Sequence, residues 1–175
     1  MSPRRHHVPD EASVYRRAET GLSVGGRLLS ERLAGSSDGL VAVLDLDRFG
    51  RINEQHGVDI GDALLAHIER SLQGAVEGWG DALALGGDQF LAVFPGHPSP
   101  AEAAPILLAA VRRTAAHTRF RRRVRVTATA GLARWPEHGR TGGILVAAAD
   151  RALRQAKAAV ERNGWAEFRT ELEEH

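Results

Sequence analysis

The sequence contains no cysteine, no long apolar run and almost no lysine. Without cysteine, neither disulfide bonds nor thiolate chemistry can contribute to the fold or to catalysis. No apolar run approaches the roughly 20 residues that a membrane-spanning helix needs. The first residues, MSPRRHHVPDE, also lack the apolar segment of a signal peptide. We therefore expect a cytoplasmic protein that has no membrane partner.

Lysine is nearly missing although cations are common. Of the 23 lysine and arginine residues, only Lys157 is a lysine, so arginine stands wherever else a cation is needed. An exposed helix surface tolerates either side chain, and chance alone would explain a single lysine. The alternative is a function that belongs to this one position.

Charge and length limit the classes of function. The 23 lysine and arginine residues nearly balance 22 acids, and the net charge of +1 gives the whole chain no general attraction to nucleic acid. With 175 residues and 43% hydrophobic content, the chain can bury one core and is too short for two ordinary domains. We expect a polar segment and helix over residues 1–35, one domain over 36–170 and a tail over 171–175.

The apolar pattern predicts helices that alternate with strands. Residues 40–47, LVAVLDLD, form an apolar run that alternates only at its end, as in a buried strand whose last residues leave the sheet. Residues 82–94, ALALGGDQFLAVF, indicate two strands joined at Gly86 and Gly87. We further expect helices over 12–33, 59–76, 99–120 and 141–163, and strands over 123–135 and 165–168. This order predicts an α+β fold, a sheet with a split βαβ core flanked by helices.

Acidic residues stand at the ends of two predicted strands. Asp45 and Asp47 end the first strand, and Asp88 lies at the tip of the hairpin. In a split βαβ sheet these carboxylates can meet at one edge, where they would suit Mg²⁺ or Mn²⁺ and the phosphates that such a metal brings. Each acid could equally be a solvated loop residue, and the two glycines could serve only the turn.

Several segments in order resemble the GGDEF domain of diguanylate cyclases. They are DLDRFGRINEQHGVDIGDALL, LALGGDQFLAVF, VRVTATAGLARWPEHG and AADRALRQAKAAVERNG, and the resemblance runs from Leu40 to about Phe168. It implies a palm-like core with a mostly antiparallel sheet. It also implies GTP as ligand, Mg²⁺ or Mn²⁺ as cofactor and, in active members, a homodimer that converts two GTP molecules into cyclic di-GMP.

The resemblance also assigns roles to single residues. It implies metal binding by Asp45, Asp88 and the carbonyl of Leu46. The remaining nucleotide-binding positions would be Asn53 and Asp62 at the guanine edge, the backbone at Phe49 and Gly50 near the phosphates, the turn residues Gly86 and Gly87, and Lys157 on phosphate. An amide and a carboxylate match the donors and acceptors of guanine, and a compact ammonium suits a point contact with phosphate.

Some positions depart from the family pattern. Gly50 stands where the family usually has a phosphate-facing lysine, and Val58 replaces the common histidine after Gly57. The segment before the hairpin has Asp81 without the arginine of the product-inhibition motif R-x-x-D. We therefore expect a weaker grip on phosphate and no feedback by cyclic di-GMP at that site.

The largest departure is Gln89, beside Asp88 in the catalytic motif. The family has a glutamate here, which is thought to help bind metal and to assist loss of a proton from GTP. A neutral amide is no base and is a weaker metal ligand than a carboxylate. Losing a general base typically costs about two to four orders of magnitude in rate, so the sequence leaves open whether the chain is an enzyme.

Two functions follow, with a third weighed against them. The favoured one is a GTP- and Mg²⁺-binding protein whose cyclase activity is impaired or lost, acting in cyclic-dinucleotide signalling or as a nucleotide-sensing interaction module. The alternative is an active homodimeric diguanylate cyclase in which a water, Asp47 or a second metal replaces the glutamate. The segment RFRRRVRV, residues 119–126, could attract nucleic acid, but a solvated face is the favoured interpretation and we expect no such partner. A homodimer or a protein partner could form through the N-terminal segment.

Overall fold

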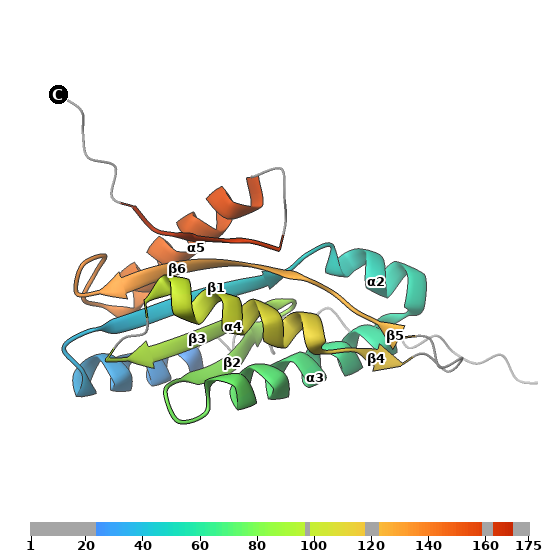
Figure 1. Ribbon diagram of the computed structural model, residues 1–175, viewed down its shortest axis with the longest axis horizontal. Helices are drawn as coiled ribbons and strands as arrows, with labels where there is room; N and C mark the ends of the chain where they lie inside the picture. The colour runs from blue at the N-terminus through green and yellow to red at the C-terminus, as the bar shows by residue number, and fades with distance from the viewer. Residues whose placement is uncertain (1–23, 97–98, 118–122, 159–162, 170–175) are drawn as a thin grey trace, which may run out of the picture.

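The computed structural model describes residues 24–96, 99–117, 123–158 and 163–169. A helical segment over residues 24–35, called the N-terminal helix below, precedes the first strand. The elements that follow are β1 (Gly39–Leu46), α2 (Phe49–His56), α3 (Val58–Val76), β2 (Asp81–Gly86), β3 (Gln89–Pro95), α4 (Pro100–Arg113), β4 (Ala116–His117), β5 (Arg123–Val124), β6 (Ala128–Trp135), α5 (Gly142–Ala158) and β7 (Trp165–Glu167) (Figure 1).

A five-stranded sheet in the order β2-β3-β1-β6-β7 forms the centre of the molecule. All neighbouring strands run antiparallel except β6 and β7, which are parallel. Because β1 and β2 both pair antiparallel with β3, they run parallel to each other with β3 between them, and α2 and α3 connect them. The predicted α+β fold with a mostly antiparallel sheet and a split βαβ core is confirmed.

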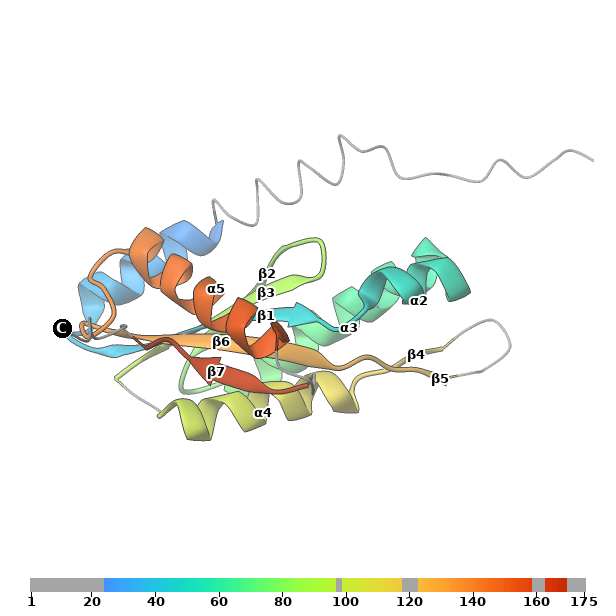
Figure 2. The ribbon, with the colours of Figure 1, turned by 90° about the horizontal axis from the view of Figure 1, so that it is seen from above.

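Helices cover both faces of the sheet, and β1 supplies side chains to both cores. Leu40, Ala42 and Leu44 pack in a cluster with α3 and α4, whereas Val41 and Val43 pack in a second cluster with the N-terminal helix and α5. Figure 2 shows α5 and the N-terminal helix on one side of the sheet and α4 on the other. Burial on both faces explains why the sequence of this strand is apolar without interruption.

The predicted helix 59–76 is present as α3, and its buried face carries the apolar residues at helical spacing, including Leu64, Ile68 and Leu72. Ser99 is the N-cap residue of α4. Its backbone N–H and its hydroxyl both donate to the Glu102 carboxylate, each at 2.9 Å, in a capping box.

Three predicted boundaries were wrong. The helix expected over 99–120 ends at Arg113, where the Thr114 hydroxyl and N–H donate to the carbonyls of Ala110 and Val111 and the chain becomes extended. The strand expected over 123–135 is divided into β5 and β6, and residues 125–127 between them are irregular. The helix expected over 141–163 begins at Gly142, and Asn163 lies outside it with a left-handed φ of 68°.

One helix was not expected. Residues 49–56 form α2, which buries only Phe49 and Ile52. Two apolar residues give too short a pattern for periodicity to indicate a helix.

The expected helix 12–33 is confirmed only over its described part from residue 24, because 12–23 lie outside the described residues. Arg119 to Arg122 of the basic segment also lie outside them. Within the described ranges, none of the helices combines the length and apolar content that a bilayer crossing requires.

Candidate functional site

The end of β1 lies beside the tip of the β2–β3 hairpin. Asp45 pairs with Gln89 in the strand register, and the Leu46 N–H donates to the Asp88 carbonyl at 3.1 Å. In an antiparallel ladder the N–H and C=O of one residue point to the same neighbouring strand, so the Leu46 carbonyl also faces the hairpin. The structure therefore brings together the predicted set of Asp45, Leu46, Asp88 and Gln89.

The two glycines of the hairpin tip adopt conformations that other residues rarely adopt. Gly86 has a φ of 124° and Gly87 a φ of 58°, and a register irregularity lies between Ala84 and Gly86. Glycine reaches these angles without the penalty of a Cβ atom. The turn therefore requires glycine by its geometry, whether or not a ligand approaches it.

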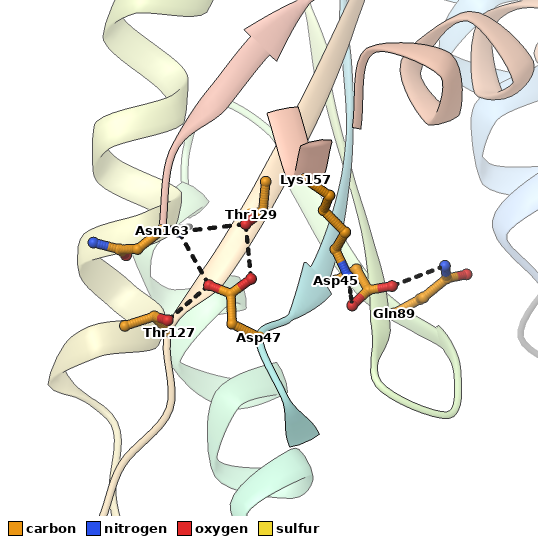
Figure 3. A network of polar contacts seen from close by, with 7 residues as sticks. All are labelled: Asp45, Asp47, Gln89, Thr127, Thr129, Lys157 and Asn163. Carbon is orange, nitrogen blue, oxygen red and sulfur yellow. Dashed lines mark hydrogen bonds and ion pairs between the residues drawn. The ribbon is translucent and has the colours of Figure 1, made fainter. Parts of the chain in front are cut away.

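Both carboxylate oxygens of Asp45 have a partner from another element. The Lys157 ammonium, in the last turn of α5, forms an ion pair with Oδ1. The Gln89 side-chain N–H group donates to Oδ2 over 3.4 Å. Figure 3 shows the two donors on either side of this carboxylate. The side chains of Lys157 and Asp45 are 25% and 18% exposed, so the pair is shielded from water more than a typical surface ion pair.

The carboxyl group of Asp88 lies close enough to Asp45 to feel its charge. Burial raises the pKa of Asp88 above its ordinary value, and the neighbouring Asp45 charge raises it further; a backbone hydrogen bond and the Lys157 charge act in the opposite direction. Two carboxylates that repel each other provide hard oxygen ligands for a divalent cation. No group of three His, Cys, Asp or Glu side chains gathers within the described residues, so a metal here would have Asp45, Asp88 and the Leu46 carbonyl as protein ligands.

Asp47 is buried, and its carboxylate points away from that of Asp45 (Figure 3). Its two oxygens accept hydrogen bonds from the Thr127 and Thr129 hydroxyls, both at 2.7 Å, and from the Asn163 backbone N–H at 3.1 Å. Its own N–H donates to the Thr127 carbonyl at 2.8 Å. Asp47 thus joins the end of β1 to β6 and to the chain that leads into β7.

The start of α2 lies directly after the end of β1. Arg48, the N-cap residue, has a left-handed φ of 57°, and no side chain caps the helix. The free N–H groups of a helix start form a local positive pole that suits phosphate. Phe49 is buried and anchors this turn, and Gly50 is exposed with open space where a Cβ atom would lie.

Asn53 lies where α2 packs on α3. Its side-chain oxygen Oδ1 is buried and has no hydrogen-bond partner within the described protein. A Cβ atom at Gly61 would lie 1.9 Å from this oxygen, so the glycine makes the space that the amide occupies. An unpaired buried acceptor is costly. Asp62 follows Gly61 in α3, and its side chain is exposed.

Five residues have roles that were not predicted from the sequence: Asp47, Thr127, Thr129, Asn163 and Gly61. The alternation of Thr127 and Thr129 was a usable signal, because residues two apart in a strand face the same side. No comparable signal existed for Gly61, since its role depends on how two helices pack.

Comparison with known proteins identifies the family. The family model of the GGDEF domain of diguanylate cyclases matches residues 26–163. An uncharacterized signaling protein of Caulobacter vibrioides is 38% identical over 130 residues, which are 73% of this chain and 16% of that protein. The bifunctional diguanylate cyclase/cyclic di-GMP phosphodiesterase MucR of Pseudomonas aeruginosa is 32% identical over 133 residues, 75% of this chain and 19% of MucR. The chain thus spans less than a fifth of the length of these two relatives.

Solved structures agree with this assignment. The GGDEF domain of TpbB (YfiN) from Pseudomonas aeruginosa superposes with a TM-score of 0.74 at 27% identity, over 85% of this chain and 94% of that one. A sensory box/GGDEF family protein from Caulobacter crescentus gives a TM-score of 0.65 at 35% identity, over 77% and 90% of the two chains. The sequence match and the shared fold together place this chain in the GGDEF domain family, related to the diguanylate cyclases.

Proposed function

We propose that the chain binds a guanine nucleotide together with Mg²⁺ or Mn²⁺ and that its cyclase activity is impaired or lost, so that it acts as a nucleotide-sensing module. The observation that carries this proposal is the contact at Asp45. There the Asp45 carboxylate contacts Lys157 and the neutral amide of Gln89. A glutamate at position 89, as in the family pattern, would place a third acid beside Asp45 and Asp88. The ligand-binding groups are thus present while the basic group is missing.

The described residues divide the work of binding. Asp45, Asp88 and the Leu46 carbonyl would hold the metal, whose charge would offset that of the phosphates. The first N–H groups of α2 at Phe49 and Gly50 would face those phosphates, with Lys157 as the cation. The unpaired Asn53 oxygen would accept a hydrogen bond from one N–H of guanine. The carboxylate of Asp62, the residue after Gly61, would accept a hydrogen bond from a second N–H. Gly86 and Gly87 would allow close approach at the hairpin tip.

The same residues explain why turnover would be slow. Gln89 cannot accept a proton at neutral pH, and its amide N–H group already points at Asp45. Gly50 adds no side-chain cation to the phosphates. Loss of a general base alone typically costs about 10²- to 10⁴-fold in rate, so binding would remain while catalysis falls.

Calorimetry of the purified protein tests the binding. GTP, GDP, ATP and cyclic di-GMP would each be titrated with and without Mg²⁺. We expect GTP to bind with Mg²⁺ present and ATP to bind more weakly, because the acceptors at Asn53 and Asp62 match guanine. If none of the four nucleotides bound, the proposed function would be wrong.

An active diguanylate cyclase is the second candidate, favoured by the retained Asp45, Asp88, Asn53 and Lys157 and by the relatedness to cyclases. Asp47 is a poor substitute for the missing base, because both of its oxygens accept hydrogen bonds within the fold. A water or a second metal would have to replace the missing base. The active form would be a homodimer or would have a protein partner bound through the N-terminal segment.

Product formation separates the two candidates. Incubation with GTP and Mg²⁺ or Mn²⁺, followed by chromatography, should give little cyclic dinucleotide from the wild type and about 10²-fold more from Gln89→Glu if only the base is missing. Rapid formation by the wild type would favour the second candidate. No gain from Gln89→Glu would point instead to the phosphate contacts, Gly50 above all.

A further inference from the structure

The ion pair between Lys157 and Asp45 places a protein cation on a carboxylate of the proposed metal site. Lys157 therefore competes with any metal for Asp45, in addition to its expected contact with phosphate. Like-signed charges cannot occupy one carboxylate at close range without a large Coulomb cost. For a divalent cation to bind Asp45 fully, the lysine has to move.

The charges around the carboxylate pair show why the protein needs a cation there. Asp45 and Asp88 repel each other, and the Lys157 charge counteracts the rise that this repulsion causes in the pKa of Asp88. Gln89 brings no further negative charge and donates to the second oxygen of Asp45. The set of Asp45, Asp88 and Lys157 thus contains two carboxyl groups and one amino group, a formal charge of −1 without any metal.

Lys157 is placed so that its charge can move while its helix stays fixed. Its neighbour Ala156 is buried, which anchors the last turn of α5. The lysine side chain has a flexible stem of four carbons, so rotation about its bonds can move the ammonium by several ångströms at little cost in free energy. A nucleotide phosphate beside the acids would offer the ammonium a new partner.

We propose that Lys157 is the internal counter-ion of the carboxylate pair in the ligand-free protein and that nucleotide phosphate draws it away. Metal alone then binds weakly, and metal and nucleotide bind cooperatively. The coupling is reciprocal, because each ligand must raise the affinity of the other by the same factor. This inference rests on the proposed function, since it assumes that metal and nucleotide share this site.

The test measures binding of Mn²⁺ alone, followed by electron paramagnetic resonance of the free ion. Lys157→Met should bind Mn²⁺ about tenfold more tightly than the wild type, because it removes a competing charge from a partly buried carboxylate. Lys157→Arg keeps the charge and should stay within about threefold of the wild type. Arg154→Met is the matched control: it removes one charge from the same helix, at an exposed residue paired with Asp150, and should leave Mn²⁺ binding unchanged.

The second measurement is calorimetry with a GTP analogue whose α,β-bridging oxygen is replaced by methylene, so that no cyclisation occurs. With Mn²⁺ present, Lys157→Met should bind this analogue about tenfold more weakly than the wild type, through loss of a phosphate contact. Opposite changes in the two affinities are the signature of a lysine that moves between two partners. A lysine needed only for folding would weaken both affinities, and thermal unfolding of each variant would reveal it.

The outcomes separate the inference from the function beneath it. If the wild type bound the Mn²⁺–analogue complex but Lys157→Met bound Mn²⁺ alone no better than the wild type, the counter-ion inference would be wrong and the proposed function would stand. If the wild type failed to bind the Mn²⁺–analogue complex, the proposed function would be wrong, and the inference with it.

Discussion

At the scale of single residues, neighbouring acids have different tasks because their surroundings differ. Asp45 and Asp88 lie partly exposed at the strand ends and repel each other, whereas Asp47 is buried and accepts three hydrogen bonds. A carboxylate with three donors supports the fold. A carboxylate beside a like charge stores unfavourable energy that a cation can relieve.

The raised pKa of Asp88 predicts how stability depends on pH without metal. Because the folded protein holds this proton more tightly than the unfolded chain, the contribution of Asp88 to stability is full below its ordinary pKa of 3.8 and is lost as the pH rises through the higher folded value. Asp88→Asn should therefore stabilise the metal-free protein at pH 7, by less than about 1 kcal/mol because solvent screens the partly exposed group.

Urea unfolding at several pH values would check this effect. The gain from Asp88→Asn should shrink as the pH falls toward 3.8. Glu77→Gln, at an exposed position after α3, serves as the control and should show no such trend. A gain that grew on acidification would contradict the assigned direction of the pKa shift.

At the scale of elements, the α2–α3 pair combines a phosphate-facing helix start with a close contact made by glycine. The N-cap residue Arg48 is left-handed, and Gly50 in the first turn is surrounded by open space. Gly61 in α3 leaves room for the Asn53 amide. Both glycines can therefore be substituted to test one function each, phosphate binding at Gly50 and base recognition at Gly61.

Gly50→Lys should restore a cation near the phosphates. No atom of the described residues lies within 4 Å of the place that a Cβ atom would take here, so the fold should accept the side chain. We expect about fivefold tighter binding of GTP by calorimetry, from one added charge–phosphate contact. Gly74→Lys is the matched control, because Gly74 is also helical, exposed and surrounded by open space. Equal gains from both variants would show that net charge alone, and not the place of the lysine, acts on GTP.

Gly61→Ala should weaken recognition of the base while keeping the helix. The new Cβ atom would lie 1.9 Å from the Asn53 oxygen and 3.1 Å from the Phe49 ring, so the amide must move. Alanine is favoured over glycine in a helix by up to about 1 kcal/mol, which offsets the strain. We expect the preference for GTP over ATP, measured as a ratio of dissociation constants, to fall about tenfold.

Gly74→Ala gives the control for this change, since it adds a methyl group to the same helix at a point where the described part of the chain has no atom within 4 Å. It should leave the preference for GTP unchanged. If Gly61→Ala also kept the full preference, Asn53 would have no part in recognising guanine.

At the scale of the whole molecule, one buried carboxylate holds together segments that are far apart in the chain. Asp47 accepts hydrogen bonds from Thr127 and Thr129, which lie 80 and 82 residues further along the chain, and from Asn163, which lies 116 residues further. These bonds fix the ends of β1 and β6 and the entry to β7, and so they fix the edge of the sheet where the candidate site lies. The geometry of the site therefore depends on a residue that faces away from it.

Asp47→Ala should destabilise the protein by about 3 kcal/mol, because it leaves buried donors without an acceptor. Urea unfolding measures the loss. Thr127→Val removes a single hydroxyl from the same network and should cost about 1 kcal/mol. A loss from Asp47→Ala no greater than that from Thr127→Val would contradict the central place of this carboxylate.

The sequence by itself determined the fold class, the order of most elements and the strand-end position of the acids. Strand β1 was predictable because burial on both faces makes its sequence a continuous apolar run, and helix α3 because burial of one face gives its apolar residues helical spacing. The Gly86-Gly87 turn was predictable because its backbone angles select glycine. Helix α2 and the ends of α4 and α5 were not, because they depend on short segments and on contacts from elsewhere in the chain.

Only the tertiary structure decided which partner each functional group has. That Lys157 reaches Asp45 from 112 residues away, that Gln89 donates to the same carboxylate, and that Asp47 faces a different network are results of how β1, β3, β6 and α5 meet. Local sequence sets the backbone period and the turn types. Hydrogen bonds and ion pairs between distant residues depend on directions and distances that exist only once the sheet has formed.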